Sequence, residues 1–200
     1  PIASVHGEAY EYYDVLLRMH SSLGGEGILP TELIFVAEQS GLILQIDRWV
    51  ITQAVLTAAE KYKAGQLVHF FVRLSGASLS DATLLPWLQQ LLADKSLPPA
   101  TIIFDVPHTV VSQRLTDTQH FMSYIKVLGC RFALRDFDDK PDTLQLLNSL
   151  AVDFVKIKGS LVQGLTQDSE NLTAIRTILK TVHRQNKLVI APFVEDADKL

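Results

Sequence analysis

Residues 131–158, RFALRDFDDKPDTLQLLNSLAVDFVKIK, contain the pattern that decides the fold. Two short runs rich in β-branched and aromatic residues, Arg131 to Asp136 and Asp153 to Ile157, enclose a segment from Thr143 to Leu150 with helical spacing of apolar residues. The middle of each run is apolar, which is typical of strands that are buried on both faces. The stretch therefore predicts a strand, a helix and a second strand parallel to the first.

The same alternation continues on both sides of this stretch. Further strands are expected at Tyr13 to Arg18, Val68 to Leu74, Thr101 to Val106 and Leu188 to Ala191. Further helices are expected at Thr31 to Gly41, Ile46 to Ala64, Leu84 to Asp94, Thr118 to Leu128 and Ser169 to Asn186. This order predicts an α/β fold with a mostly parallel sheet, which is either an open doubly wound sheet or a closed barrel.

The N-terminal segment departs from this alternation. Ile2 to Val5 and Tyr12 to Leu17 are separated by a short polar segment that contains His6, Gly7 and Glu8. Two apolar runs around a short polar connection predict a hairpin.

The composition predicts a single globular domain over residues 1–200. The chain is 48% hydrophobic with a formal charge of -4, so it is suited to a sizeable core and lacks the basic footprint of a DNA- or RNA-binding protein. It has no apolar run long enough for membrane insertion and no secretory signal. Its single cysteine, Cys130, excludes an internal disulfide and fits a cytoplasmic location. Because it begins without Met, we expect it to be part of a larger multidomain protein.

Charged residues follow the expected strands. In open α/β sheets and in barrels, ligands bind at the carboxyl ends of the strands. The residues at these ends are Arg18, Arg73 with Ser75, Asp105 to His108, Arg135 with Asp136, Lys156 with Lys158, and Phe193 with Glu195. Each alone could be an ordinary solvated loop residue, but as a set they predict a binding site at one rim.

Seven segments, read in order, resemble the EAL domain family, the bacterial phosphodiesterases that hydrolyse cyclic di-GMP on a modified TIM barrel. They are Tyr13 to Arg18, Pro30 to Ile43, Asp47 to Val50, Val72 to Ser75, Arg135 to Phe137, Val152 to Lys158 and Ala191 to Glu195. The resemblance implies a modified (β/α)8 barrel of the EAL type. Because such barrels typically have about 250 residues, we expect the C-terminal unit to lie outside this chain.

Departures from the family pattern fall on the metal ligands. Active members hold two divalent metals with carboxylates and one Asn, and the metals activate the attacking water. The corresponding residues here are Asp14, Arg73, His108, Arg135, Lys158 and Pro192. Cations at these positions repel the hard metal ions that need oxygen ligands. We therefore expect no metal and no catalytic residues, although Lys156, Asp105, Asp136 and Glu195 are retained.

Ligand binding can survive this loss of catalysis. Arg18 and Arg73 are candidates for the phosphates, Glu195 for the Watson–Crick edge of guanine and Phe193 for base stacking. Phe71 is a further candidate, with a core position as its alternative. Arg135 and Lys158 either supply the positive field of the metals or pair with neighbouring carboxylates. The expected ligand-binding residues are Leu16, Arg18, Phe71, Arg73, Ser75, Asp105, Asp136, Lys156, Phe193 and Glu195.

The resemblance implies a catalytically inactive cyclic di-GMP receptor that binds the dinucleotide at the barrel mouth. Within the family, Asp14-Val15-Leu16 is most similar to the altered motif of degenerate members in type IV pilus regulation and twitching motility. That similarity implies signalling to a protein partner, a PilZ-domain protein. The alternatives are a ligand-independent interaction scaffold and a weak cyclic di-GMP phosphodiesterase.

Overall fold

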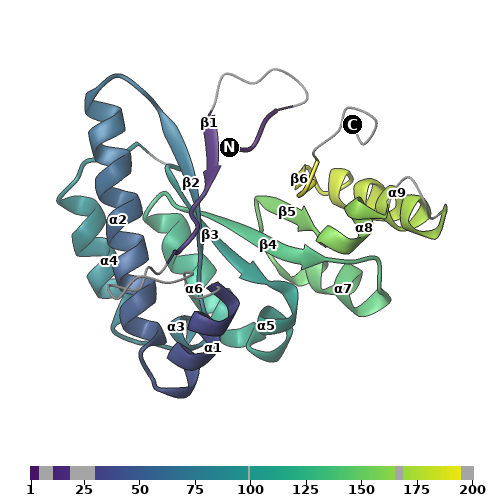
Figure 1. The fold of residues 1–200 in the computed structure, drawn as a ribbon, viewed down its shortest axis with the longest axis horizontal. Coiled ribbons are helices and arrows are strands. Elements are labelled where there is room, and N and C mark those ends of the chain that lie inside the picture. Colours follow the sequence, from purple (N-terminus) through teal and green to yellow (C-terminus); the bar gives the residue numbers. More distant parts are fainter. Residues whose placement is uncertain (5–10, 19–29, 99, 165–168, 195–200) are drawn as a thin grey trace, which may run out of the picture. The chain divides into compact units, whose positions relative to one another are not determined.

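The computed structural model describes residues 1–4, 11–18, 30–98, 100–164 and 169–194. The chain divides into two compact units, one formed by residues 1–104 and 124–130 and the other by residues 105–123 and 131–200. The boundary lies inside the third strand, so each unit contains part of the alternating series of strands and helices (Figure 1).

The first unit contains the N-terminal strands and helices. In chain order its complete elements are β1 (Glu11–Asp14), α1 (Pro30–Gln39), α2 (Ile43–Lys63), β2 (Val68–Arg73), α3 (Gly76–Leu79) and α4 (Leu84–Ala93). β1 and β2 are parallel, with Asp14 aligned with Phe71. An isolated antiparallel bridge joins Ile2 to Tyr12, as expected for the outer pair of the hairpin, whose connection lies outside the described residues.

The second unit contains the remaining strands. β3 (Ile102–Pro107) and α6 (Leu115–Val127) are shared between the units, and α5 (His108–Gln113) lies between them in sequence. The following elements are β4 (Arg131–Phe137), α7 (Pro141–Leu146), the 3-10 helix η1 (Leu147–Ser149), β5 (Phe154–Ile157), α8 (Gly159–Gln163), α9 (Ser169–His183) and β6 (Leu188–Ile190). Hydrogen-bonded strands follow one another in chain order, and β4, β5 and β6 pair in parallel.

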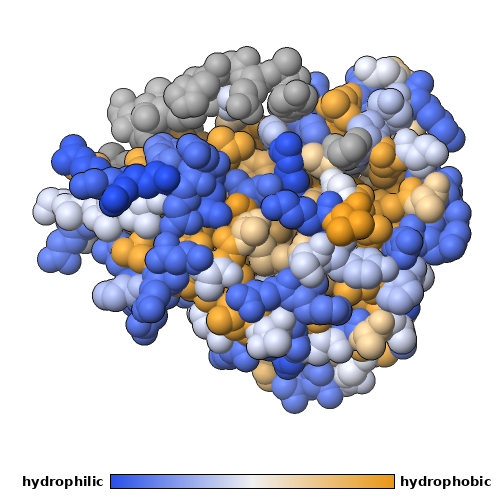
Figure 2. All heavy atoms as spheres, turned by 180° about the vertical axis from the view of Figure 1, so that it is seen from behind, coloured by the Kyte–Doolittle hydropathy of each residue, from blue (hydrophilic) through white to orange (hydrophobic). Residues whose placement is uncertain are grey.

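The α/β alternation predicted from the sequence is confirmed. The central strands are buried along their length, as the apolar runs predicted: Ile103, Phe104 and Val106 in β3 have no exposed surface. Helix α2 buries one face, which includes Val50, Ile51 and Val55, and exposes the other. On the face of the molecule shown in Figure 2, hydrophilic side chains alternate with apolar ones. Within the described residues, no helix combines the length and hydrophobicity needed to cross a membrane.

Two features differ from the prediction. The first strand was expected at Tyr13 to Arg18, but it spans Glu11–Asp14, and its pairing with β2 ends where Asp14 is aligned with Phe71. Three short helices, α3, α5 and α8, follow directly after β2, β3 and β5 and were not predicted. Each has six residues or fewer, so none is long enough to show a helical period.

Candidate functional site

The carboxyl end of β2 presents an exposed arginine. Arg73, the last residue of β2, is exposed, whereas Val72 and Leu74 on either side are buried. Within the part of the chain that the structure describes, Arg73 forms no ion pair or side-chain hydrogen bond. None of its guanidinium donors is therefore used by a described residue.

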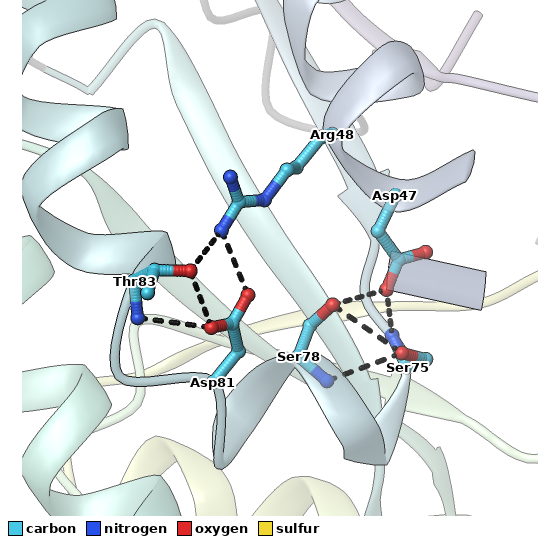
Figure 3. A network of polar contacts seen from close by, with 6 residues as sticks. All are labelled: Asp47, Arg48, Ser75, Ser78, Asp81 and Thr83. Carbon is cyan, nitrogen blue, oxygen red and sulfur yellow. Dashed lines mark hydrogen bonds and ion pairs between the residues drawn. The ribbon is translucent and has the colours of Figure 1, made fainter. Parts of the chain in front are cut away.

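The turn after Arg73 is held by a buried aspartate of α2 (Figure 3). Asp47 Oδ2 accepts hydrogen bonds from the backbone N–H of Ser75 at 2.9 Å and from Ser78 Oγ at 2.7 Å. Ser75 in turn caps α3, because its Oγ accepts from the backbone N–H of Ser78 at 3.3 Å. Burial raises the pKa of Asp47, although the hydrogen bonds from Ser75 and Ser78 counteract part of this effect.

The neighbouring residue of α2 holds the far end of the same loop. Arg48 donates to Asp81 Oδ2 at 2.8 Å and to Thr83 Oγ1 (Figure 3). Its guanidinium also lies 5.3 Å from the centre of the Trp87 ring. The hydroxyl of Thr83, with its backbone N–H and the charge of Arg48, holds the pKa of Asp81 below its ordinary value. Asp47 and Arg48 thus anchor both ends of the loop that follows Arg73.

The segment after β1 places two more predicted site residues on the surface. Leu16 is 54% exposed, and Arg18 is exposed without an ion pair among the described residues. Phe71, in contrast, is fully buried, and its ring lies 6.0 Å from that of Tyr12. The expectation that Phe71 contacts a ligand is corrected by this burial, because its ring has no exposed face on which a base could stack. It is a core residue of the first unit.

In the second unit, a β-bulge shapes the end of β4. Leu134 pairs with Val155 and Phe137 with Ile157, so Arg135 and Asp136 together lie opposite Lys156. Asp136 adopts a φ of 58°, in the left-handed region that residues other than glycine rarely occupy. A bulge of this kind redirects side chains at the end of a strand. Here it brings two charged residues of β4 to the position of one residue of β5.

These residues form a chain of ion pairs around a buried carboxylate. Asp105 is completely buried, and Lys156 Nζ lies 2.7 Å from its Oδ2. Arg135 Nε lies 3.3 Å from Asp105 Oδ1, without the geometry of a directed hydrogen bond, and Arg135 Nη1 lies 2.8 Å from Asp136 Oδ2. Of the two alternatives left open for Arg135, the structure therefore shows the pairing with carboxylates.

The remaining charged residues at these strand ends are less constrained. Lys158, which precedes α8, is exposed and has no ion pair among the described residues. His108 begins α5, and its Nδ1 is buried without a hydrogen-bond partner. Burial would raise the pKa of Asp138, but hydrogen bonds from Thr143 and Lys140 and the charges of His108 and Lys140 hold it below its ordinary value.

This donor set does not fit a pair of divalent metals. Both oxygens of Asp105 face cations, and Arg135 and Lys158 stand where metal ligands were expected. Among the described residues, no group of three or more His, Cys, Asp or Glu side chains is arranged to hold a metal ion. A metal here would have to displace Lys156 and Arg135 from Asp105, and each carries the same sign of charge as the metal.

Phe193 follows β6; the residue is 56% exposed, and its backbone has a φ of 58°. Glu195, the other residue expected to contact the base, lies outside the described residues. The structure thus brings Asp105, Asp136 and Lys156 together, and places Leu16, Arg18, Arg73 and Phe193 at exposed positions near strand ends. Sequence reasoning missed the role of Asp47, for which the only signal was its place in a segment similar to the EAL pattern.

Comparison with known proteins identifies the family. The model of the EAL domain family matches residues 1–200, and the chain belongs to this family. It is 35% identical to the FimX EAL domain from Pseudomonas aeruginosa bound to c-di-GMP, with a TM-score of 0.91 over 100% of this chain and 79% of that chain. It is 27% identical to the Xanthomonas citri FimX EAL domain in complex with c-di-GMP, with a TM-score of 0.88 over 94% of this chain and 74% of that one.

A curated relative with a named activity is the cyclic di-GMP phosphodiesterase PdeF of Escherichia coli strain K12. It is 27% identical over 99% of this chain, which spans 26% of that protein. The chain thus covers about a quarter of the length of such relatives. The chain is thus similar to FimX EAL domains, and this likeness confirms the α/β fold of EAL domains.

Proposed function

We propose that this EAL domain is a catalytically inactive receptor that binds cyclic di-GMP at the carboxyl ends of its strands and signals to a protein partner. The observation that carries the proposal is the contrast between lost and retained groups. The metal-ligand positions hold Arg73, Arg135 and Lys158, whereas exposed groups suited to phosphates and bases remain.

Hydrolysis by the family depends on two metals that generate the attacking hydroxide. Asp105, a carboxylate retained from the family pattern, is neutralised from both sides by Lys156 and Arg135. Lys156 is itself buried, and its ammonium group is held by Asp105. A site of this kind has no means of activating water, which supports the loss of turnover.

Phosphate binding falls to the first unit in this proposal. Arg73 is exposed, lacks an ion pair among the described residues and precedes a turn held by Asp47, so its planar guanidinium can donate two parallel hydrogen bonds to a phosphate. Arg18 is the second candidate, with Leu16 beside it as an exposed apolar contact for the ligand. Ser75 supports Arg73 by capping α3.

Base recognition falls to Phe193 and Glu195. An exposed aromatic ring can stack on guanine, which contributes roughly 1 to 3 kcal/mol per base. A carboxylate at Glu195 can accept the adjacent N–H donors of the Watson–Crick edge. The complexes of two FimX EAL domains with c-di-GMP support the same ligand for this chain.

Calorimetric titration of the chain with cyclic di-GMP, once with EDTA and once with Mg2+, tests the proposal. We expect equal micromolar or tighter binding in both titrations and no linear pGpG product. Arg73→Ala should weaken binding, whereas Arg176→Ala, which removes an exposed arginine of α9, should not. Absence of binding by the folded chain would contradict the receptor, and Mg2+-dependent pGpG would favour the weak phosphodiesterase.

The proposed partner is a PilZ-domain protein of type IV pilus regulation in the cytoplasm, by analogy with FimX. It is tested by pull-down of a purified PilZ-domain protein with and without cyclic di-GMP. We expect the ligand to change the amount captured, and Arg73→Ala to abolish that change. If neither cyclic di-GMP nor Arg73→Ala changes the amount captured, the result would favour the ligand-independent scaffold.

A further inference from the structure

Phe193 has a combination of features that packing alone does not explain. Five residues other than glycine have a positive φ among the described residues, and Phe193 is the aromatic one, at 58°. A bulky residue in the left-handed region is strained. The residue is 56% exposed, so burial recovers only part of that cost. Strain that persists without a packing reason points to function.

The covered side of the ring lies on the backbone of Gly159, the first residue of α8. A β-carbon built at residue 159 would lie 2.5 Å from Cε2 and 2.8 Å from Cδ2 of Phe193, closer than real β-carbons approach other atoms. The ring thus occupies the space that any other residue at position 159 would need. Glycine is the one residue that leaves the ring where it is.

The backbone itself does not require glycine at this position. Gly159 does not have a positive φ, unlike Gly41, Gly65 and Gly129. It is the first residue of α8, where a residue with a β-carbon is also compatible with the helix. The backbone therefore allows a β-carbon at position 159, and contact with the Phe193 ring is the opposing reason in the structure.

We propose that Gly159 is a positioning residue, which holds the Phe193 ring in the orientation that stacks on a purine base of the ligand. This inference rests on the proposed function. A ring that is already fixed on one side loses little freedom when a base covers the other, so the binding of the base is preorganised. The exposed side of the ring is then the stacking surface.

A double-mutant cycle with cyclic di-GMP tests this coupling. Phe193→Ala should weaken binding roughly fivefold to a hundredfold, as expected for a lost stacking ring. Gly159→Ala should weaken binding several-fold by displacing the ring, and should have no effect in the Phe193→Ala background. Equal effects of Gly159→Ala in both backgrounds, or none in the wild type, would overturn the proposal.

Gly164→Ala is the matched control in the same part of the chain. Its β-carbon would meet the Asn171 side chain rather than Phe193, so it should perturb packing and leave the ligand affinity unchanged. The NMR signal of the guanine H8 proton gives a readout specific to stacking. It should shift upfield on binding to the wild type and to Gly164→Ala, and shift less with Gly159→Ala.

Melting temperatures separate this inference from the proposed function. If the wild type binds no cyclic di-GMP, the proposed function fails, and with it the stacking role. The contact is still tested, because Gly159→Ala should lower the melting temperature in the wild type but not in the Phe193→Ala background. If Gly159→Ala does not fold, refolding of the double variant supports the contact, and failure of the double variant to fold contradicts it.

Discussion

Two arginines stand where the resemblance to the family implies metal ligands, and their surroundings differ. Arg73, at the end of β2, is exposed, precedes a turn held by hydrogen bonds to Asp47, and has no ion pair among the described residues. Arg135, in the bulge of β4, has a side chain that is only 23% exposed and contacts Asp105 and Asp136. Arg73 is thus available for an anion, whereas Arg135 is paired with carboxylates of its own unit.

The difference teaches that charge at a strand end does not by itself define a binding site. A paired guanidinium must give up its carboxylate before it can bind a phosphate, whereas an unpaired one gives up only water. We therefore expect mutations around Arg135 to affect stability first and mutations at Arg73 to affect ligand binding first.

The largest effect is expected from Asp105→Ala. This change leaves Lys156 buried without its counter-ion, which should lower the free energy of unfolding by about 3 to 5 kcal/mol. Denaturant unfolding followed by circular dichroism measures it, with Asp139→Ala as an exposed control. Adding Lys156→Met should restore part of the loss, and a loss below about 1 kcal/mol for Asp105→Ala would show that the pair is dispensable.

Arg73→Ala and Arg135→Ala test the comparison directly. Loss of charge-assisted hydrogen bonds to a phosphate should weaken cyclic di-GMP binding of Arg73→Ala roughly tenfold to a hundredfold. Its free energy of unfolding should change by less than about 0.5 kcal/mol, because the side chain is exposed. Arg135→Ala should show the larger loss of stability. Calorimetry measures the ligand affinity of both variants, and denaturant unfolding measures their stability. A larger loss of affinity in Arg135→Ala, with a larger loss of stability in Arg73→Ala, would contradict the distinction between the two arginines.

A smaller effect is expected at acidic pH from the loop network of the first unit. The folded-state pKa of Asp81 is lowered, so its contribution to stability is present above its ordinary pKa of 3.8 and is lost as pH falls through the folded value. Asp81→Asn should remove this loss. Stability measured from about pH 6 to about pH 2 should then fall less steeply than in the wild type. If the stability of Asp81→Asn falls as steeply with decreasing pH as that of the wild type, the pairing of Asp81 with Thr83 and Arg48 would be contradicted.

Asp47 should act with the opposite sign in the same network. Its folded-state pKa is raised, so protonation is easier in the folded than in the unfolded state, and its contribution falls as pH rises from 3.8 through the folded value. Asp47→Asn removes the hydrogen bonds of the carboxylate and also the cost of burying its charge. At pH values above that window, it should therefore lower the free energy of unfolding by less than the loss of the hydrogen bonds alone. For each variant, the difference in free energy of unfolding from the wild type is measured as a function of pH. This difference should change with pH in opposite directions for Asp47→Asn and Asp81→Asn, and a change in the same direction would contradict this interpretation.

The smallest effect concerns Cys130, an uncharged residue that precedes β4. Burial raises the pKa of its thiol to about 12, so almost no thiolate forms at neutral pH. We expect no reaction of the folded chain with a thiol reagent and complete reaction after unfolding. Rapid labelling of the folded chain would show that residues around Cys130 open readily.

The sequence alone was sufficient for the order of strands and helices, because burial on both faces of parallel strands leaves apolar runs that can be recognised locally. It was also sufficient for the family, since the motifs of the family depend on residue identity. It was not sufficient for α3, α5 and α8, which are too short to show a period, or for the end of β1 at Asp14, which depends on the pairing between strands.

Only the tertiary structure decided which of the charged residues are paired. Lys156 and Asp105 are 51 residues apart in the sequence, and the bulge that brings Arg135 to Asp105 depends on the register between β4 and β5. Likewise, Phe71 belongs to the core and Phe193 to the surface, although both are aromatic residues near strand ends. Residue identity determines what a side chain can bind, and the packing around it determines whether the side chain is available.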